Sequence, residues 1–191
     1  MEPSELLQHL VAKFDELGID YLVTGSMATI TFGEPRFTLD IDVVARIEPS
    51  QIDAICGVFP APDFYVSRQA VSDAVRDHRQ FNVIHPSSGL KIGIIVAGDD
   101  EFNRSRFRRG GDVPVPGGTF ARFAAPEDVI LRKIQYYQEG QSDKHVRDII
   151  GVFRISGDRI DRGYLNEWAH RLNVSDTWKS IESMLPPGCE S

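Results

Sequence analysis

The spacing of apolar residues changes near residue 124, and this change constrains the fold of the chain more than any other sequence feature. Before it, short runs of β-branched and aromatic residues alternate with longer runs at helical spacing, as in an α/β domain. After it, successive segments carry apolar residues three and four positions apart, which predicts helices. We therefore expect a core over residues 1–124, a helical portion packed on it over 125–185, and a loose tail over 186–191.

The predicted core consists of short strands and helices separated by glycine, proline and polar residues. Ser4 is the predicted N-cap of the first helix and Gly18 its end. Residues 86–89 predict a hairpin between the last two strands of the core. Strands are expected over residues 19–24, 39–47, 64–66, 81–85 and 90–96, and helices over 5–17, 26–32, 49–59 and 69–77.

The helical portion has recognisable start signals. Pro126 is followed by two acidic residues, and both proline and negative charge are favoured in the first turn of a helix. This helix is expected to run to about Glu139. Three further helices have as their predicted N-caps Ser142, Asp161 and Ser175, because each precedes an apolar stripe at helical spacing.

Charge and composition exclude some classes of function. The net charge is −7 and the pI is about 5.2, so the chain is not expected to wrap nucleic acid, although a local basic patch is compatible with these values. No apolar run approaches the roughly 20 residues of a membrane helix, and the N-terminus lacks the features of a signal peptide. Cys56 and Cys189 show no metal-ligand spacing and are expected to be free thiols. These features predict a cytoplasmic protein without a membrane anchor.

Asp40 and Asp42 are the first candidate for a functional site. In a strand they point to the same face, with Cα atoms roughly 6.6 Å apart. Two carboxylates at this distance repel each other, and a bound dication removes the conflict. Hard oxygen ligands suit Mg²⁺ or Mn²⁺, and such an ion can neutralise charge on a nucleotidyl group during transfer. The alternative is a solvated strand end that carries two surface acids.

The pair Gly25-Ser26 ends the preceding strand, where a helix is expected to begin. Glycine permits close approach of the backbone, while Ser26 offers a hydroxyl group and helix-start N–H groups to phosphate oxygens. By itself, Gly-Ser is a common turn. Followed by Asp40-Ile41-Asp42 after residues 27–39, it forms a set of residues suited to holding a triphosphate beside a metal ion.

This set resembles the nucleotidyltransferase superfamily, whose signature is an apolar strand, Gly-Gly or Gly-Ser, a gap of this kind and Asp-x-Asp. The resemblance implies an α/β (α+β) fold, with a mixed sheet of the nucleotidyltransferase type, flanking helices and a C-terminal helical portion. It also implies metal-dependent transfer of an NMP from an NTP to RNA, protein or a small molecule. Residues 81–85, 126–133 and 147–148 are further similar to a bacterial group related to AbiEii-type toxins, which makes an antitoxin a candidate partner.

The toxin relatives place a lysine and a later aspartate in the site, and Lys133 and Asp148 occupy the matching positions. Lys133 is expected to contact phosphate and neutralise charge; the alternative is a lysine that snorkels from a packed helix. Arg36 lies shortly before the acid pair and is a candidate substrate-binding arginine, or else a plain loop charge. Together with Gly25 and Ser26, these residues form the predicted substrate-binding set.

One residue of the family pattern is missing. Related enzymes carry a third carboxylate on a later strand, in a Lys-apolar-Asp sequence, whereas this chain has Lys91-Ile92-Gly93. An extended chain covers roughly 20 Å between Gly93 and Asp99, so neither Asp99 nor Asp100 is expected to replace that carboxylate. Loss of a general base typically lowers a rate about 10²–10⁴-fold. A catalytically degenerate binding protein is therefore the alternative function.

Residues 103–109 form the densest basic stretch, with Phe107 between arginines. They could hold a triphosphate or an RNA acceptor, with arginine on phosphate and Phe107 stacked on a base. The alternative is a solvated helix end or loop. The five histidines show no zinc-site spacing, and no Walker or dinucleotide-binding motif occurs.

Overall fold

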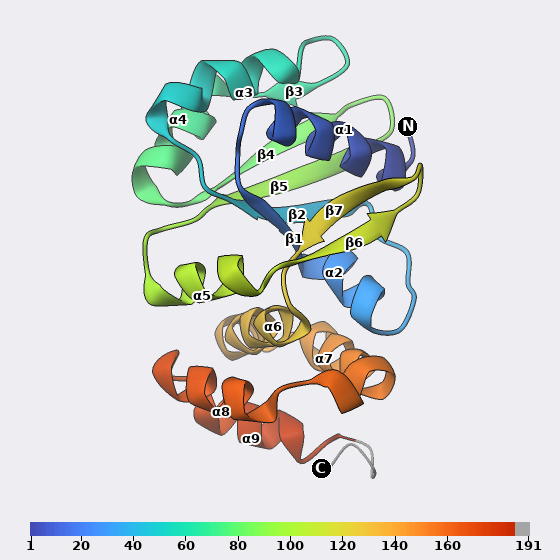
Figure 1. Ribbon diagram of the computed structural model, residues 1–191, viewed down its shortest axis with the longest axis vertical. Coiled ribbons are helices and arrows are strands. Elements are labelled where there is room, and N and C mark those ends of the chain that lie inside the picture. The colour runs from blue at the N-terminus through green and yellow to red at the C-terminus, as the bar shows by residue number, and fades with distance from the viewer. Residues whose placement is uncertain (186–191) are drawn as a thin grey trace. The chain divides into compact units, whose positions relative to one another are not determined.

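The computed structural model describes residues 1–185 and divides into two compact units. The boundary between the units falls inside helix α2 (Gly25–Phe32), so the start of this helix belongs to the first unit and the rest to the second. The first unit, which contains the sheet in Figure 1, comprises Met1–Met27 and Phe37–Ala124, and the second comprises Ala28–Arg36 and the chain from Ala125 onward.

The first unit is built on a seven-stranded sheet with the order β3-β4-β5-β2-β1-β7-β6 (Figure 1). Strand β2 runs parallel to β5, and β1 parallel to β7, while the other neighbours are antiparallel. The expected mixed sheet and the expected hairpin of β4 and β5 are therefore confirmed. The strands are β1 (Tyr21–Thr24), β2 (Asp40–Ala45), β3 (Tyr65–Val66), β4 (Gln80–His85), β5 (Leu90–Val96), β6 (Gly111–Val115) and β7 (Thr119–Phe123).

Helices of the first unit cover the sheet. Helix α1 (Pro3–Glu16) packs on β2 and β7 through its buried apolar stripe, and α4 (Arg68–Asp77) packs on β4 and β5. The predicted cap at Ser4 is wrong. The helix begins at Pro3, and the N–H of Glu2 donates to the Glu5 carboxylate at 2.7 Å, which closes a capping box. The remaining helices of this unit are η1 (Pro49–Gln51), α3 (Ile52–Val58) and α5 (Glu101–Arg109).

Strands β6 and β7 are absent from the sequence-based expectation. Strand β6 is the last strand of the sheet, and most of its residues are exposed, so it lacks the alternation that marks a half-buried strand. Pro114 is tolerated there because an edge strand has backbone groups that need no partner. Gly117 and Gly118 both have positive φ angles and form the turn between the two strands.

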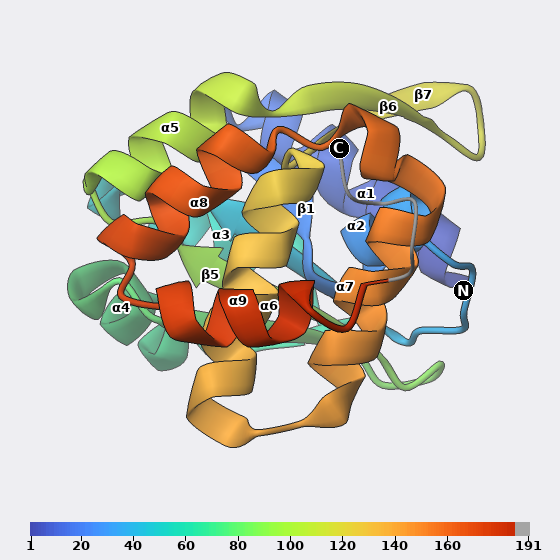
Figure 2. The ribbon, with the colours of Figure 1, turned by 90° about the horizontal axis from the view of Figure 1, so that it is seen from below.

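In the described part of the second unit, α6 (Pro126–Gly140) contacts α7 (Asp143–Ser156), α8 (Arg162–Arg171) and α9 (Ser175–Glu182) (Figure 2). A short helix η2 (Gly157–Arg159) follows α7. The predicted caps Ser142 and Asp161 are confirmed, and the Asp161 carboxylate accepts from the N–H of Tyr164 at 2.9 Å. The predicted cap Ser175 is wrong, because α9 already includes this residue and Val174 precedes it as N-cap. Buried apolar residues of this unit include Leu131, Ile134, Ile149, Phe153 and Trp178.

The structure adds residues 28–36 to the second unit through contacts with α7. The hydroxyl of Ser156 donates to the carbonyl of Phe32 at 2.6 Å, and Arg154 pairs with Glu34 at 2.9 Å. A side chain at Gly33 would place its Cβ 2.9 Å from the backbone nitrogen of Val152, so glycine allows this close approach. These contacts fix the position of Arg36 relative to α7.

No helix within residues 1–185 is both long and apolar enough to cross a lipid bilayer. Cys56 on α3 is a free thiol, and burial raises its pKa, which lowers the thiolate fraction. Cys189 and the expected loose tail, residues 186–191, lie outside the described residues.

Candidate active site

The acid pair lies on one face of β2, as the alternation predicted. The side chain of Asp40 is 53% exposed and Asp42 is half-buried, whereas Ile41 and Val43 on the opposite face are fully buried. Burial of those two apolar side chains fixes which face of the strand looks into the core. The two carboxylates are therefore held on the opposite, more accessible face by the packing of their neighbours.

The neighbouring strand β5 completes this face. Its parallel register sets Lys91 beside Asp40 and Gly93 beside Asp42. The ammonium nitrogen of Lys91 lies 3.2 Å from Oδ1 of Asp40, so a cation already accompanies one of the two acids. The sequence shows Lys91 two residues before Gly93, but the pairing of β2 with β5 that brings it to Asp40 has no local sequence signal.

Gly93 occupies a position from which a side chain would enter the acid pair. A Cβ built there lies 2.9 Å from Oδ1 of Asp42 and 2.6 Å from Nε2 of Gln80. Asp100 instead caps α5 by accepting from the N–H of Asn103 at 2.8 Å, and Asp99 pairs with Arg104 at 2.7 Å. Within residues 1–185, no three Asp, Glu, His or Cys side chains gather closely enough to hold a metal ion.

The glycine-serine turn touches the acid pair directly. Strand β1 pairs with β2 so that Thr24 lies opposite Asp42, and α2 begins at the next residue. Gly25 has a φ of +60°, and a Cβ there would collide with Oδ2 of Asp42. Only glycine satisfies both conditions without strain. Ser26, at 8% exposure, follows Gly25 in the first turn of α2.

These donors fit a divalent ion that arrives with a phosphate ligand. Carboxylates of Asp40 and Asp42 are hard oxygen donors, which Mg²⁺ and Mn²⁺ prefer. Mg²⁺ commonly uses one or two carboxylates and completes its coordination with water and substrate phosphates. Two acids beside the glycine-serine turn therefore suit such a site, and Lys91 adds a positive charge to the same face.

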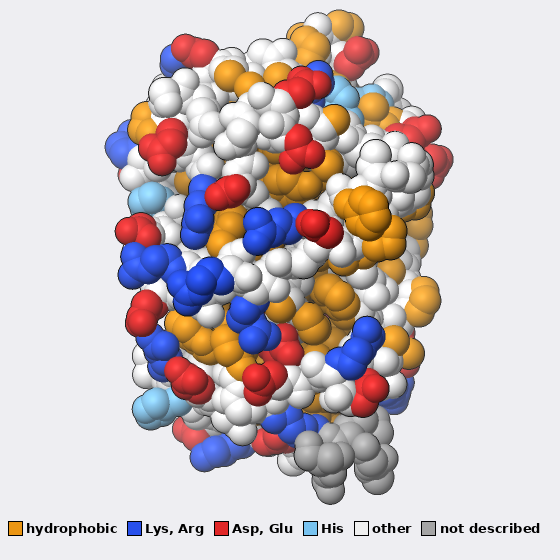
Figure 3. All heavy atoms as spheres, viewed as in Figure 1, with side chains coloured by type: hydrophobic (Ala, Val, Ile, Leu, Met, Phe, Trp, Pro, Cys, Tyr) orange, Lys and Arg blue, Asp and Glu red, His pale blue; other side chains and the backbone are white. Residues whose placement is uncertain are grey.

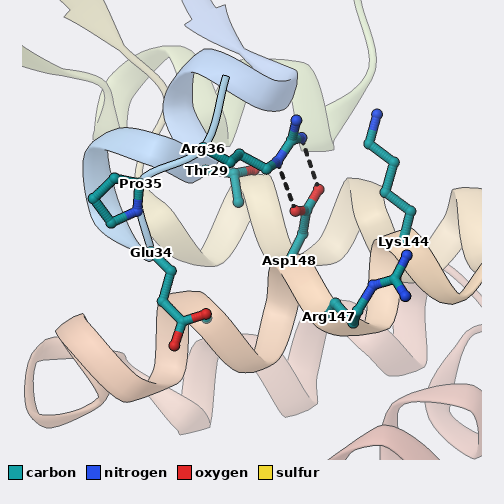
Figure 4. A pocket seen from close by; sticks show the side chains of 8 residues that line it. Thr29, Glu34, Pro35, Arg36, Lys144, Arg147 and Asp148 are labelled. Carbon is teal, nitrogen blue, oxygen red and sulfur yellow. Dashed lines mark hydrogen bonds and ion pairs between the residues drawn. The ribbon is translucent and has the colours of Figure 1, made fainter. Parts of the chain in front are cut away.

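A second cluster lies within the second unit and unites three predicted residues. Lys133 on α6 donates to Oδ2 of Asp148 on α7 at 2.6 Å. Arg36 grips the same carboxylate with two bonds, Nε to Oδ1 at 3.1 Å and Nη2 to Oδ2 at 3.2 Å (Figure 4). Lys133 is 5% exposed and Asp148 7%. Arg36 is therefore part of a buried ion-pair network and not a plain loop charge.

Burial and pairing shift the pKa values of this cluster. Burial lowers the pKa of Lys133, and the hydrogen bond and charge of Asp148 oppose that effect. Burial also raises the pKa of Asp148, but the hydrogen bonds and charges of Lys133 and Arg36 outweigh it and hold this pKa below its usual range. The neighbouring His145 has its pKa lowered by burial and by the charge of Lys133. Asp148 is thus kept ionised between two cations.

A cavity of about 270 Å³ opens beside this network. Figure 4 shows Arg36 on one side of Asp148 and Lys144 and Arg147 on the other. With Lys133, the cations Arg36, Lys144 and Arg147 outnumber the two carboxylates Glu34 and Asp148, so the surroundings of the cavity have an excess of positive charge. Lys144 and Arg147 were not predicted as site residues, although they precede Asp148 by four and one positions on the same helix. The lining consists of Thr29, Glu34, Pro35, Arg36, Lys144, Arg147, Asp148 and Gly151.

The basic stretch, residues 103–109, is not arranged to bind a nucleic-acid base. Residues 103–109 lie in α5, where Phe107 is 4% exposed and the guanidinium of Arg46 sits 4.2 Å from its ring centre. Phe107 is therefore a core residue and cannot stack on a base. Arg106 is also buried, whereas Arg104 and Arg108 are exposed. Figure 3 shows Lys and Arg side chains gathered near α5 with Asp and Glu side chains among them, which dilutes any basic patch.

Comparison with known proteins defines the fold. Neither a scan against protein-family models nor a search of curated proteins found a match. Among solved structures, an antigenic nucleotidyltransferase-like protein from Paracoccidioides brasiliensis is 19% identical, with a TM-score of 0.55 over 92% of this chain and 91% of that one.

Two antibiotic-modifying proteins are also similar. ANT(2″)-Ia in complex with adenylyl-2″-tobramycin is 13% identical, with a TM-score of 0.55 over 95% of this chain and 97% of that one. The lincosamide antibiotic adenylyltransferase LnuA, lincomycin-bound, is 10% identical, with a TM-score of 0.51 over 81% of this chain and 98% of that one. The chain described here therefore has the fold of the nucleotidyltransferases.

Proposed function

We propose that this protein is a metal-dependent nucleotidyltransferase that moves an NMP unit from an NTP to an acceptor. The observation that carries the proposal is the close approach of Gly25 to Asp42, which sets the glycine-serine turn against one member of the acid pair. A solvated strand end would need neither a glycine at positive φ nor a close approach to the acid. The nucleotidyltransferase fold of the solved neighbours supports the same assignment.

The residues of the first unit have complementary tasks in this proposal. Asp40 and Asp42 hold Mg²⁺ or Mn²⁺, which when bound neutralises charge on the phosphates. Gly25 brings the backbone close to the triphosphate, and Ser26 and the N–H groups at the start of α2 donate to phosphate oxygens. The acceptor oxygen then bonds to the α-phosphorus as the bond to pyrophosphate breaks, and the acceptor proton passes to water or to a base.

The cluster of the second unit binds an anionic part of a substrate. Lys133 keeps Asp148 ionised, and Asp148 in turn holds the planar guanidinium of Arg36 in a fixed orientation. The cations that line the cavity, Arg36, Lys144 and Arg147, contact this anionic part, and Lys133 acts on it through Asp148. RNA, protein or a small molecule with hydroxyl groups can serve as the acceptor.

A nucleotide-binding protein without catalysis is the second candidate. It is favoured by Gly93, which stands beside Asp42 where related enzymes are expected to carry a third acid. Membership of a toxin–antitoxin pair and a cytoplasmic location rest on the sequence alone and remain predictions.

Label transfer separates the two candidates. The purified protein is incubated with each α-labelled NTP, with Mg²⁺ or Mn²⁺, and with bulk RNA, protein lysate or tobramycin as acceptor. An enzyme moves label to an acceptor, and a chelator abolishes the transfer because the two acids alone leave the phosphate charge uncompensated. Metal-dependent nucleotide binding without transfer identifies the binding protein. Absence of both binding and transfer contradicts both candidates.

Gly93→Asp tests whether the missing acid limits the rate. A Cβ at this position would lie 2.6 Å from Nε2 of Gln80 and 2.9 Å from Oδ1 of Asp42. The variant is therefore made together with Gln80→Ala, which removes the closer contact, and the carboxylate of Asp42 must shift to relieve the other. We expect the transfer rate to rise about tenfold or more, a part of the roughly 10²–10⁴-fold that a general base supplies. Gly93→Asn with Gln80→Ala is the matched control, since it adds the same volume without a base. Equal transfer rates in the two variants would show that the missing carboxylate at position 93 does not limit the rate.

A further inference from the structure

The face of the sheet that carries Asp40 and Asp42, here called the acid face, also carries Lys91. The proposed function gives Lys91 no task. Lys91 and Gly93 are two residues apart on β5, and Asp40 and Asp42 are two residues apart on β2, so each pair lies on one face of its strand. The parallel register sets Lys91 beside Asp40 and Gly93 beside Asp42. The ammonium lies 3.2 Å from Asp40, and the two side chains are 40% and 53% exposed. An ion pair this exposed is weak, so Asp40 can exchange Lys91 for a competing cation at little cost.

The ammonium changes what the acid pair can bind. A bare dication approaching Asp40 and Asp42 meets the charge of Lys91 on the same face and is repelled by it. A metal–nucleotide complex instead carries net negative charge, because one dication does not neutralise a triphosphate. The metal ion of such a complex repels the ammonium of Lys91, whereas the phosphate oxygens of the complex attract it. Lysine is also a common phosphate ligand in proteins.

We propose that Lys91 makes the acid pair select a metal–nucleotide complex over the free metal ion. In the free protein the ammonium is the counter-ion of Asp40, and in the complex it moves to a phosphate oxygen of the nucleoside triphosphate. This inference rests on the proposed function, because it takes the acid pair as the metal site. A purely structural ion pair between β2 and β5 would affect stability and leave metal binding unchanged.

Binding of Mn²⁺ tests the proposal without reference to catalysis. The free Mn²⁺ signal is followed by electron paramagnetic resonance for the wild type and for Lys91→Gln, with and without the α,β-methylene analogue of each NTP. We expect Lys91→Gln to bind Mn²⁺ alone about fivefold more tightly, the upper end of what an exposed ion pair contributes. The analogue should strengthen Mn²⁺ binding to the wild type more than to the variant, since the two ligands are coupled through Lys91.

Two controls accompany the measurement. Lys91→Arg keeps the charge and should behave like the wild type. Lys13→Gln removes a half-buried lysine of the same unit, paired with Glu16 on α1, and should change nothing. An unchanged or weaker affinity of Lys91→Gln for Mn²⁺, or no Mn²⁺ binding by either protein, would overturn the proposal.

The outcomes also keep this inference apart from the proposed function. If label transfer is absent but Lys91→Gln still alters Mn²⁺ binding and its coupling to nucleotide, the transferase assignment fails and the role of Lys91 stands. If transfer occurs and is metal-dependent while Lys91→Gln leaves Mn²⁺ affinity unchanged, the role of Lys91 fails alone.

Discussion

Replacing Asp42 with asparagine is expected to lower the rate of nucleotidyl transfer about a thousandfold. Asparagine has nearly the shape of aspartate, so the contacts with Gly25 and Gly93 survive, but the side chain loses the charge that holds a dication. Neutralisation of phosphate charge by a metal ion contributes several kcal/mol to a transition state, and each 1.36 kcal/mol is about a factor of ten in rate. Asp40→Asn should also lower the rate of nucleotidyl transfer.

Asp53→Asn is the matched control for this experiment. Asp53 is an exposed carboxylate of the same unit, paired with Arg68 at 2.7 Å, and it lies on α3 outside the acid face. The control should keep the wild-type rate and the wild-type affinity for Mn²⁺. A folded Asp42→Asn protein that retains more than about a tenth of the rate would show that the metal is held elsewhere, since a lost metal ligand costs far more.

Local patterns predicted the elements whose own residues carry the signal. The alternation in Asp40-Ile41-Asp42 placed both acids on one face, and Gly25-Ser26 marked a strand-to-helix turn before the structure located it. Strand β6 shows the limit, because an exposed edge strand with a proline has no apolar alternation to detect. Helix starts are hard to predict where the N-cap residue makes no side-chain hydrogen bond. Val174 is such a residue before α9, and its sequence carries no capping signal.

The candidate site depends on pairings that no local pattern encodes. Lys91 reaches Asp40 only through the register of β2 with β5. Arg36 reaches Asp148 only because residues 28–36 pack on α7. The family resemblance pointed to Lys133 and Asp148 individually, but not to their direct bond. The basic neighbours of Phe107 make it a candidate for stacking on a base, but they carry no sign that packing of the apolar face of α5 buries its ring.

The buried ion pair of Lys133 and Asp148 is expected to contribute strongly to the stability of the second unit. Asp148→Leu should lower the free energy of unfolding of this unit by about 3 kcal/mol or more, because breaking a buried ion pair leaves an uncompensated charge. In this variant Lys133 stays enclosed at 5% exposure and has lost the carboxylate bonded at 2.6 Å. The urea transition can be followed by tryptophan fluorescence, since Trp168 and Trp178 both belong to the second unit.

The double variant Lys133→Met/Asp148→Leu should regain the part of the lost stability that comes from the buried Lys133, because two apolar side chains of similar volume replace this pair and only Arg36, at 30% exposure, loses the Asp148 carboxylate. Acid provides an independent check. The pKa of Asp148 is depressed in the folded protein, so its contribution is present above the unfolded value of about 3.9 and is lost as the pH falls through the lower folded value. The wild type should therefore lose stability in that acidic window and the double variant should lose less. If the single variant is as stable as the wild type, or the double variant no more stable than the single, Lys133 and Asp148 are not energetically coupled.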